Sequence, residues 1–203
     1  THTVFAGDRS HEFEMRNQGI SYQEIAAKGG GILNTVEATR LQSKKGLIEL
    51  AQKRVNHFVE QGVCTLEIKS GYGLDEKNEV KILEVIKELT GPEIIATYLG
   101  PHALAPEFSR EEYQEQILNK TLNYVAHNKL AQRVDIFIEK NYFDTEFAQK
   151  YFAKAQDLGF AIAAHVEQLS HSGGCSLALN YKAQSVDHIV EIKDVEITKL
   201  STS

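Results

Sequence analysis

Four histidines of this 203-residue chain stand where runs predicted to be β-strands end, namely His2, His102, His165 and His188. A neutral imidazole is a good ligand for zinc or iron. When parallel strands close into a barrel, side chains at their carboxyl ends meet at one mouth, even from distant parts of the sequence. A single histidine is usually a surface or hydrogen-bonded residue, so it is their shared position that favours a metal or catalytic site.

Two further side chains with useful chemistry follow strand candidates. Arg9 comes soon after His2, and its guanidinium could hold a carboxylate through two hydrogen bonds. The alternative for Arg9 is a surface salt bridge with Asp8 or Glu12. Tyr72 has a glycine on each side, which allows a tight turn that projects the ring into the mouth; the alternative is a packing role.

The segment that follows His165 offers two polar side chains, Glu167 and Gln168. In an extended strand, alternate residues share a side, so simple alternation keeps Glu167 with His165. A change of direction in the loop would instead turn Gln168 towards the pocket. Both arrangements are compatible with the sequence.

The elements that must position these residues are predicted by alternating patterns. Short β-rich runs alternate with longer amphipathic runs, which is typical of consecutive βα units around a parallel sheet. The predicted strands are 4–5, 64–68, 93–99, 134–138, 160–164 and 183–187, and the predicted helices are 43–61, 77–90, 109–130, 145–158, 173–181 and 193–201. A glycine-rich phosphate turn is missing after the first strand, which favours a (β/α)₈ barrel over a doubly wound sheet.

About six βα units can be recognised, whereas a complete barrel has eight and roughly 250 residues. We therefore expect 1–203 to be a single catalytic barrel domain of α/β class, with an N-terminal segment and the last two βα units outside this sequence. Residues 7–42 depart from the pattern and are predicted to form a long insertion at the face where barrel enzymes keep their sites.

Composition narrows the class of partner. The formal net charge is -6 without a long basic run, which argues against nucleic acid and favours a small-molecule substrate. The two cysteines, Cys64 and Cys175, support neither a disulfide framework nor a cysteine-type zinc site. Neither a membrane-spanning run nor a signal peptide is recognisable. These features lead us to expect a cytoplasmic protein without a membrane partner.

Several segments together resemble the imidazolonepropionase family of the amidohydrolase superfamily. They are Thr1-His2-Thr3-Val4-Phe5-Ala6-Gly7-Asp8-Arg9, Gly29-Gly30-Gly31-Ile32-Leu33, Glu67-Ile68-Lys69-Ser70-Gly71-Tyr72-Gly73-Leu74, Leu99-Gly100-Pro101-His102-Ala103, His165-Val166-Glu167-Gln168-Leu169 and Ser185-Val186-Asp187-His188. The resemblance implies a hydrolase that uses one divalent metal, zinc or iron, and opens the ring of 4-imidazolone-5-propanoate to give N-formimidoyl-L-glutamate in histidine degradation. A homodimer is what the family suggests.

By the same resemblance, His2 and His165 match metal ligands. His2 is the second member of a His-x-His pair whose first member would precede Thr1, and a further aspartate ligand would lie beyond Ser203. Substrate-binding positions match Arg9, Tyr22, Tyr72, His102 and Gln168. His188 matches a catalytic histidine near the reacting centre, and Gln168 is the second candidate catalytic residue. Gln168 stands where some relatives have Glu, which leaves the general base open.

Two alternative functions remain at this point. The first is another amidohydrolase, such as a nucleobase deaminase or a cyclic-imide hydrolase, which would share the metal ligands. The feature that discriminates against it is the carboxylate-holding pair, Arg9 with Tyr72. A barrel that binds an imidazole-like ligand without catalysis would show binding but no metal-dependent product.

Overall fold

The chain folds into a curled, parallel half-barrel. The computed structural model describes residues 1–20, 24 and 30–202. The sheet order is β1-β2-β3-β5-β4, β6 pairs with β5, and every pairing is parallel. The strands are β1 (Thr65–Lys69), β2 (Glu93–Tyr98), β3 (Arg133–Val134), β4 (Phe137–Ile138), β5 (Ala161–Val166) and β6 (Ser185–His188).

Strands β3 and β4 are two pieces of one strand position. Arg133 pairs with Ala161 and Phe137 pairs with His165, so both pieces keep one register along β5. Asp135 and Ile136 interrupt the pairing between them. Among the described residues the half-barrel therefore has five strand positions, and the expected order of βα units is confirmed for every predicted strand except 4–5.

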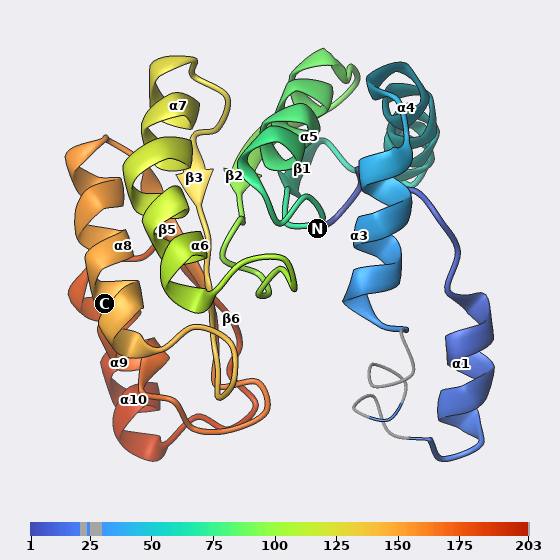
Figure 1. Ribbon diagram of the computed structural model, residues 1–203. Helices are drawn as coiled ribbons and strands as arrows, with labels where there is room; N and C mark the ends of the chain where they lie inside the picture. The colour runs from blue at the N-terminus through green and yellow to red at the C-terminus, as the bar shows by residue number, and fades with distance from the viewer. Residues whose placement is uncertain (21–23, 25–29, 203) are drawn as a thin grey trace.

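Helices cover the outer face of the sheet (Figure 1). They are α4 (Lys44–Glu60), α5 (Glu76–Glu88), α6 (Arg110–Gln116), α7 (Leu122–His127), α8 (Thr145–Asp157), α9 (Gly174–Asn180) and α10 (Asp194–Leu200). A π-helical turn, Ile117–Thr121, joins α6 to α7 where the sequence pattern predicts one helix. Side-chain caps fix several starts: Asp75 accepts the Asn78 N–H at 2.7 Å, for example.

The N-terminal residues differ from the prediction. Val4 and Phe5 form no regular strand. Two backbone carbonyls of this segment bond to an arginine side chain instead of to a neighbouring strand. The Arg54 guanidinium donates to the carbonyls of Thr3 and Phe5 at 2.9 and 2.7 Å. Only the start of the segment reaches the sheet, where the Lys69 N–H donates to the Thr1 carbonyl at 2.7 Å. The insertion that follows contains α1 (Ser10–Asn17) and α3 (Ile32–Leu41), set apart from the strands in Figure 1.

The core lies between the sheet and its helices. Ile68, Val134 and Ile162 are buried on the sheet, and Leu47, Leu83 and Phe152 meet them from the helices. Cys64 is exposed and Cys175 is buried, and both are free thiols. Among the residues described, no helix combines the length and the apolar character needed to cross a membrane.

Candidate active site

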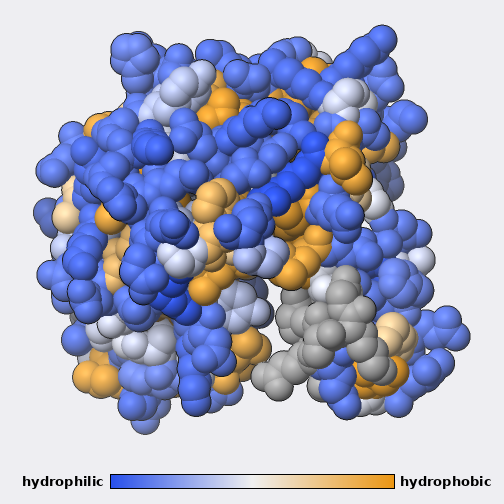
Figure 2. Space-filling model, in the orientation of Figure 1, coloured by the Kyte–Doolittle hydropathy of each residue, from blue (hydrophilic) through white to orange (hydrophobic). Residues whose placement is uncertain are grey.

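A cavity of about 640 Å³ opens where the strands end, a volume in the range of small-molecule sites. Residues singled out in the sequence line it: His2, Arg9, Tyr72, His102, His165, Gln168 and His188. Tyr22 lies outside the described residues. Figure 2 shows a mostly hydrophilic surface that is hollowed between the part carrying α10 and the part carrying α1.

The four histidines lie in a row along this cavity. The ring centroids of His2 and His102 are 4.9 Å apart, those of His102 and His165 are 6.4 Å apart, and those of His165 and His188 are 5.1 Å apart. The expected convergence of distant strand ends is therefore observed. His188 occupies a left-handed backbone conformation with φ of 75°, and such strain in a non-glycine residue is commonest at functional sites.

Burial keeps three of these imidazoles neutral at neutral pH. It lowers the pKa of His2 well below the usual range, with a further contribution from neighbouring His102. Burial also lowers the pKa of His102 to about 4 and lowers the pKa of His188. The His102 Nδ1–H donates to the Gly71 carbonyl at 2.9 Å, because a carbonyl can only accept. Its Nε2 is left with a lone pair.

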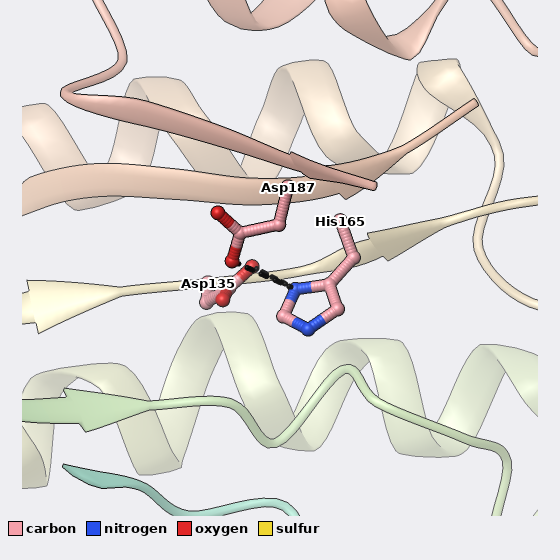
Figure 3. Close-up of side chains that lie close together, drawn as sticks. All are labelled: Asp135, His165 and Asp187. Carbon is pink, nitrogen blue, oxygen red and sulfur yellow. Dashed lines mark hydrogen bonds and ion pairs between the residues drawn. The ribbon is translucent and has the colours of Figure 1, made fainter. Parts of the chain in front are cut away.

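The fourth imidazole is tied to a buried charge network (Figure 3). His165 Nδ1 lies 3.0 Å from Asp135 Oδ1, and the Lys69 ammonium lies 2.5 Å from Asp135 Oδ2 and 2.7 Å from Asp187 Oδ2. Burial alone would raise the pKa of the Asp135 carboxyl, but His165 and Lys69 outweigh it and lower that pKa. The two carboxylates likewise raise the pKa of Lys69 against the effect of its burial.

Two sets of ligands can be considered for a metal. The ligand atoms of Asp135, His165 and Asp187 lie within 4.8 Å of one another, yet the Lys69 ammonium already occupies the cation position between the carboxylates. By contrast, Nδ1 of His2 is buried and has no hydrogen-bond partner among the described residues. Neutral imidazoles with unused lone pairs suit zinc or iron, so the cavity side of the histidine row fits a metal better.

Tyr72 reaches the cavity on a loop that is wrapped around a buried carboxylate. Glu79 of α5 accepts the N–H groups of Gly71, Gly73 and Leu74 at 3.0, 2.7 and 2.9 Å. The Tyr72 ring is thereby placed 4.6 Å from the His2 ring, centroid to centroid. Gly71 has a φ of 106°, and a Cβ there would lie 2.9 Å from His102 Nδ1, so the turn needs glycine.

Arg9 lines the cavity and makes one of the two salt bridges considered for it. Its Nε lies 3.0 Å from Glu12 Oε2, and its Nη1 donates to Thr35 Oγ1 at 3.4 Å. Glu12 is itself buried and accepts the Gly31 N–H at 2.8 Å. The salt bridge with Glu12 is therefore present, and it holds the guanidinium at the cavity wall rather than on the open surface.

The chain changes direction after β5, which is the arrangement expected to turn Gln168 towards the pocket. Glu167 adopts a left-handed conformation with φ of 50° and is fully buried. Its carboxylate accepts the N–H groups of Ser172 and Cys175 at 2.6 and 3.0 Å, at the start of α9. Gln168, not Glu167, consequently lines the cavity.

The buried Glu167 also lies near His171 and Glu196. The Ser176 hydroxyl of α9 donates to Glu196 Oε1 of α10 at 3.0 Å, which fixes α10 against α9.

Sequence reasoning missed several residues around the cavity. Asp135, Lys69 and Glu79 are buried charged groups that hold site residues, and Phe137 and Tyr142 form an apolar wall with ring centroids 4.5 Å apart. A charged residue within an otherwise apolar strand, as at Asp135, is the one signal that could have drawn attention. Arg16, Ile32 and Leu169 also line the cavity.

Comparison with known proteins identifies the family. Imidazolonepropionase of Bdellovibrio bacteriovorus is 53% identical over 204 residues, which is 100% of this chain and 48% of that protein. The chain belongs to the imidazolonepropionase family. Imidazolonepropionases of Shewanella woodyi and Shewanella baltica (strain OS155) are 44% and 43% identical over 208 residues, again across 100% of this chain.

The imidazolonepropionase match covers only part of each relative, since the chain spans about half the length of the curated relatives it matches. No protein-family model matches the chain. Among solved structures, Arabidopsis ADAL complexed with GMP is similar with a TM-score of 0.60 and 11% identity, over 94% of this chain and 62% of that one. At that identity the likeness concerns the fold alone, and it agrees with the amidohydrolase-type barrel expected from the sequence.

Proposed function

We propose that this chain forms the catalytic part of an imidazolonepropionase, which hydrolyses 4-imidazolone-5-propanoate to N-formimidoyl-L-glutamate. The observation that carries the proposal is the cavity, which gathers a row of imidazoles, Arg9 and Tyr72 at one end of the sheet. The names of the relatives in Bdellovibrio and Shewanella support it. The reaction belongs to histidine degradation.

His2 and His165 would hold the metal, zinc or iron. When bound, a divalent metal acts as a Lewis acid and lowers the pKa of water towards neutrality, which makes water a usable nucleophile. Catalytic zinc sites usually have three protein ligands, and these two histidines supply only part of that number. We propose that further metal ligands come from parts of the whole protein outside residues 1–203. We also propose that residues 1–203 and those parts together form a single barrel domain.

His188 is proposed to handle the proton. Hydrolysis breaks the carbon–nitrogen bond at the ring carbonyl, so that water supplies the new carboxylate oxygen and the ring nitrogen receives a proton. Burial keeps the His188 imidazole neutral, and a neutral imidazole can accept a proton from water and return it to the leaving nitrogen. Gln168 cannot act as a base, because an amide does not titrate, and is proposed to orient the substrate by hydrogen bonds.

Substrate binding is assigned to three other residues that line the cavity, Arg9, Tyr72 and His102. Arg9 would hold the propionate through its guanidinium, which Glu12 keeps in place at 3.0 Å. The Tyr72 ring and His102 would pack against the imidazolone, with Nε2 of His102 as an acceptor for a ring N–H. Tyr22 is proposed as a further pocket residue by family resemblance. We also propose a cytoplasmic homodimer on that basis.

Turnover of related ring compounds tests the proposed substrate. We expect imidazolonepropionate to be opened faster than imidazolone without its propionate, and expect a nucleoside and a cyclic imide to be left unchanged. Arg9→Ala should abolish the preference for the propionate, while Lys45→Ala, a matched change of an exposed cation, should leave it intact. Faster turnover of the nucleoside or the imide would refute the assignment.

A further inference from the structure

His165 is oriented by contacts at one nitrogen of its ring, Nδ1. Asp135 Oδ1 lies 3.0 Å from Nδ1, and the nearest oxygen of Asp187 is 3.9 Å away. Figure 3 shows the second ring nitrogen turned away from both carboxylates. An ionised carboxylate only accepts hydrogen bonds, so Nδ1 carries the hydrogen, and in the neutral form of the ring Nε2 then carries the lone pair.

Asp135 is itself held at both oxygens. Its Oδ1 accepts the Ile136 N–H at 2.7 Å, and its Oδ2 accepts from the Lys69 ammonium. The side chain of Asp135 is fully buried, and that of Lys69 is only 5% exposed. Asp135 lies two residues before Phe137, which pairs with His165 across the sheet. Alternate residues of a strand share a face, so the Asp135 side chain lies on the face of the sheet that carries His165.

We propose that Asp135, held by Lys69, is a positioning residue that fixes the Nδ1–H tautomer of His165 and so presents Nε2 to the cavity as a metal ligand. Only the role of Nε2 as a metal ligand rests on the proposed function; the orientation and tautomer of His165 do not. Imidazole ligands commonly donate their second ring N–H to a carboxylate, and loss of such a partner weakens metal affinity about 10–100-fold.

Asp135→Asn makes the proposal specific. The amide has one acceptor oxygen, and the Lys69 ammonium competes for it with the Ile136 N–H. The charged hydrogen bond is the stronger, so the oxygen should face Lys69 and the amide NH₂ should face His165. A donor at that place favours the opposite, Nε2–H tautomer, which has no lone pair to offer the cavity.

The tautomer can be read from ring ¹⁵N chemical shifts in the metal-free protein, with the His165 signals assigned through His165→Gln. We expect Nδ1–H in the wild type, Nε2–H in Asp135→Asn, and a return to Nδ1–H when Lys69→Met is added, since the amide oxygen is then free to face His165. Asp187→Asn is the matched control, because Asp187 also binds Lys69 but lies beyond hydrogen-bond distance of Nδ1. It should keep the wild-type tautomer.

An Nε2–H tautomer in the wild type would overturn the proposal without any variant, as would an unchanged tautomer in folded Asp135→Asn. Zinc affinity, measured by competition with a chelating dye in the whole protein, should fall about 10–100-fold in Asp135→Asn; an unchanged affinity would overturn the role towards the metal. Because the tautomer is read without substrate or metal, an error in the proposed function leaves that result unaffected.

Discussion

Replacing Glu79 with alanine should destabilise the protein and release the loop that carries Tyr72. The Glu79 carboxylate is buried and accepts three backbone N–H groups of residues 71–74 at 2.7–3.0 Å. Alanine would leave all three donors unpaired in the interior. At roughly 1 kcal/mol or more for each unpaired group, the loss is about 3 kcal/mol.

Glutamine at the same position should have a smaller effect. Oε1 accepts two of the N–H groups and Oε2 accepts the third. One amide oxygen could keep the pair, and the amide NH₂ would then face the remaining N–H. The expected loss for Glu79→Gln is therefore about 1–2 kcal/mol, that of one buried donor without an acceptor.

Urea unfolding at equilibrium measures these losses. With a slope of about 2 kcal/mol per molar, 3 kcal/mol moves the midpoint by roughly 1.5 M. Glu84→Ala is the matched control on the same helix, because Glu84 makes only a partly exposed pair with Lys44, worth about 0–1 kcal/mol. If Glu79→Ala shifts the midpoint no more than Glu84→Ala, the carboxylate does not shape the loop.

Two further substitutions and one labelling experiment have expected outcomes. Gly71→Ala should lower the melting temperature more than Gly62→Ala, because both have positive φ but only at Gly71 would a Cβ lie 2.9 Å from other atoms; equal shifts would contradict the contact. At pH 8 a thiol reagent should label Cys64 but not Cys175, since burial raises the pKa of Cys175 to about 11; two equivalents before unfolding would be the opposite result. Arg9→Ala should raise KM by a factor equivalent to about 2 kcal/mol with little change in kcat; an unchanged KM would remove Arg9 from substrate binding.

The fold was largely accessible from the sequence because its signal is local. Each βα unit is a short apolar run followed by an amphipathic run, and β5 and α8 begin within one residue of the predicted bounds. The strand expected at Val4–Phe5 was wrong for a reason outside the segment, since Arg54 donates to the carbonyls of Thr3 and Phe5. Helical periodicity also could not indicate the π-helical turn between α6 and α7.

The site was accessible only in part. The positions of the four histidines follow from strand ends, which periodicity locates. The groups that orient them do not: Asp135 meets Lys69 across 66 residues and His165 across 30, and such pairings depend on how the sheet curls. The choice between Glu167 and Gln168 was likewise decided by one left-handed residue, a conformation that an extended pattern does not announce.

Metal-dependent turnover of 4-imidazolone-5-propanoate is the most direct test of the proposed activity. The whole protein, at the length of its relatives, would be assayed as purified, after removal of metal by a chelator, and after addition of zinc or iron, with metal content measured in each sample. We expect ring opening to disappear with the metal and to return in proportion to the metal restored. Undiminished turnover in metal-free protein, or none in metal-loaded protein, would contradict the proposal.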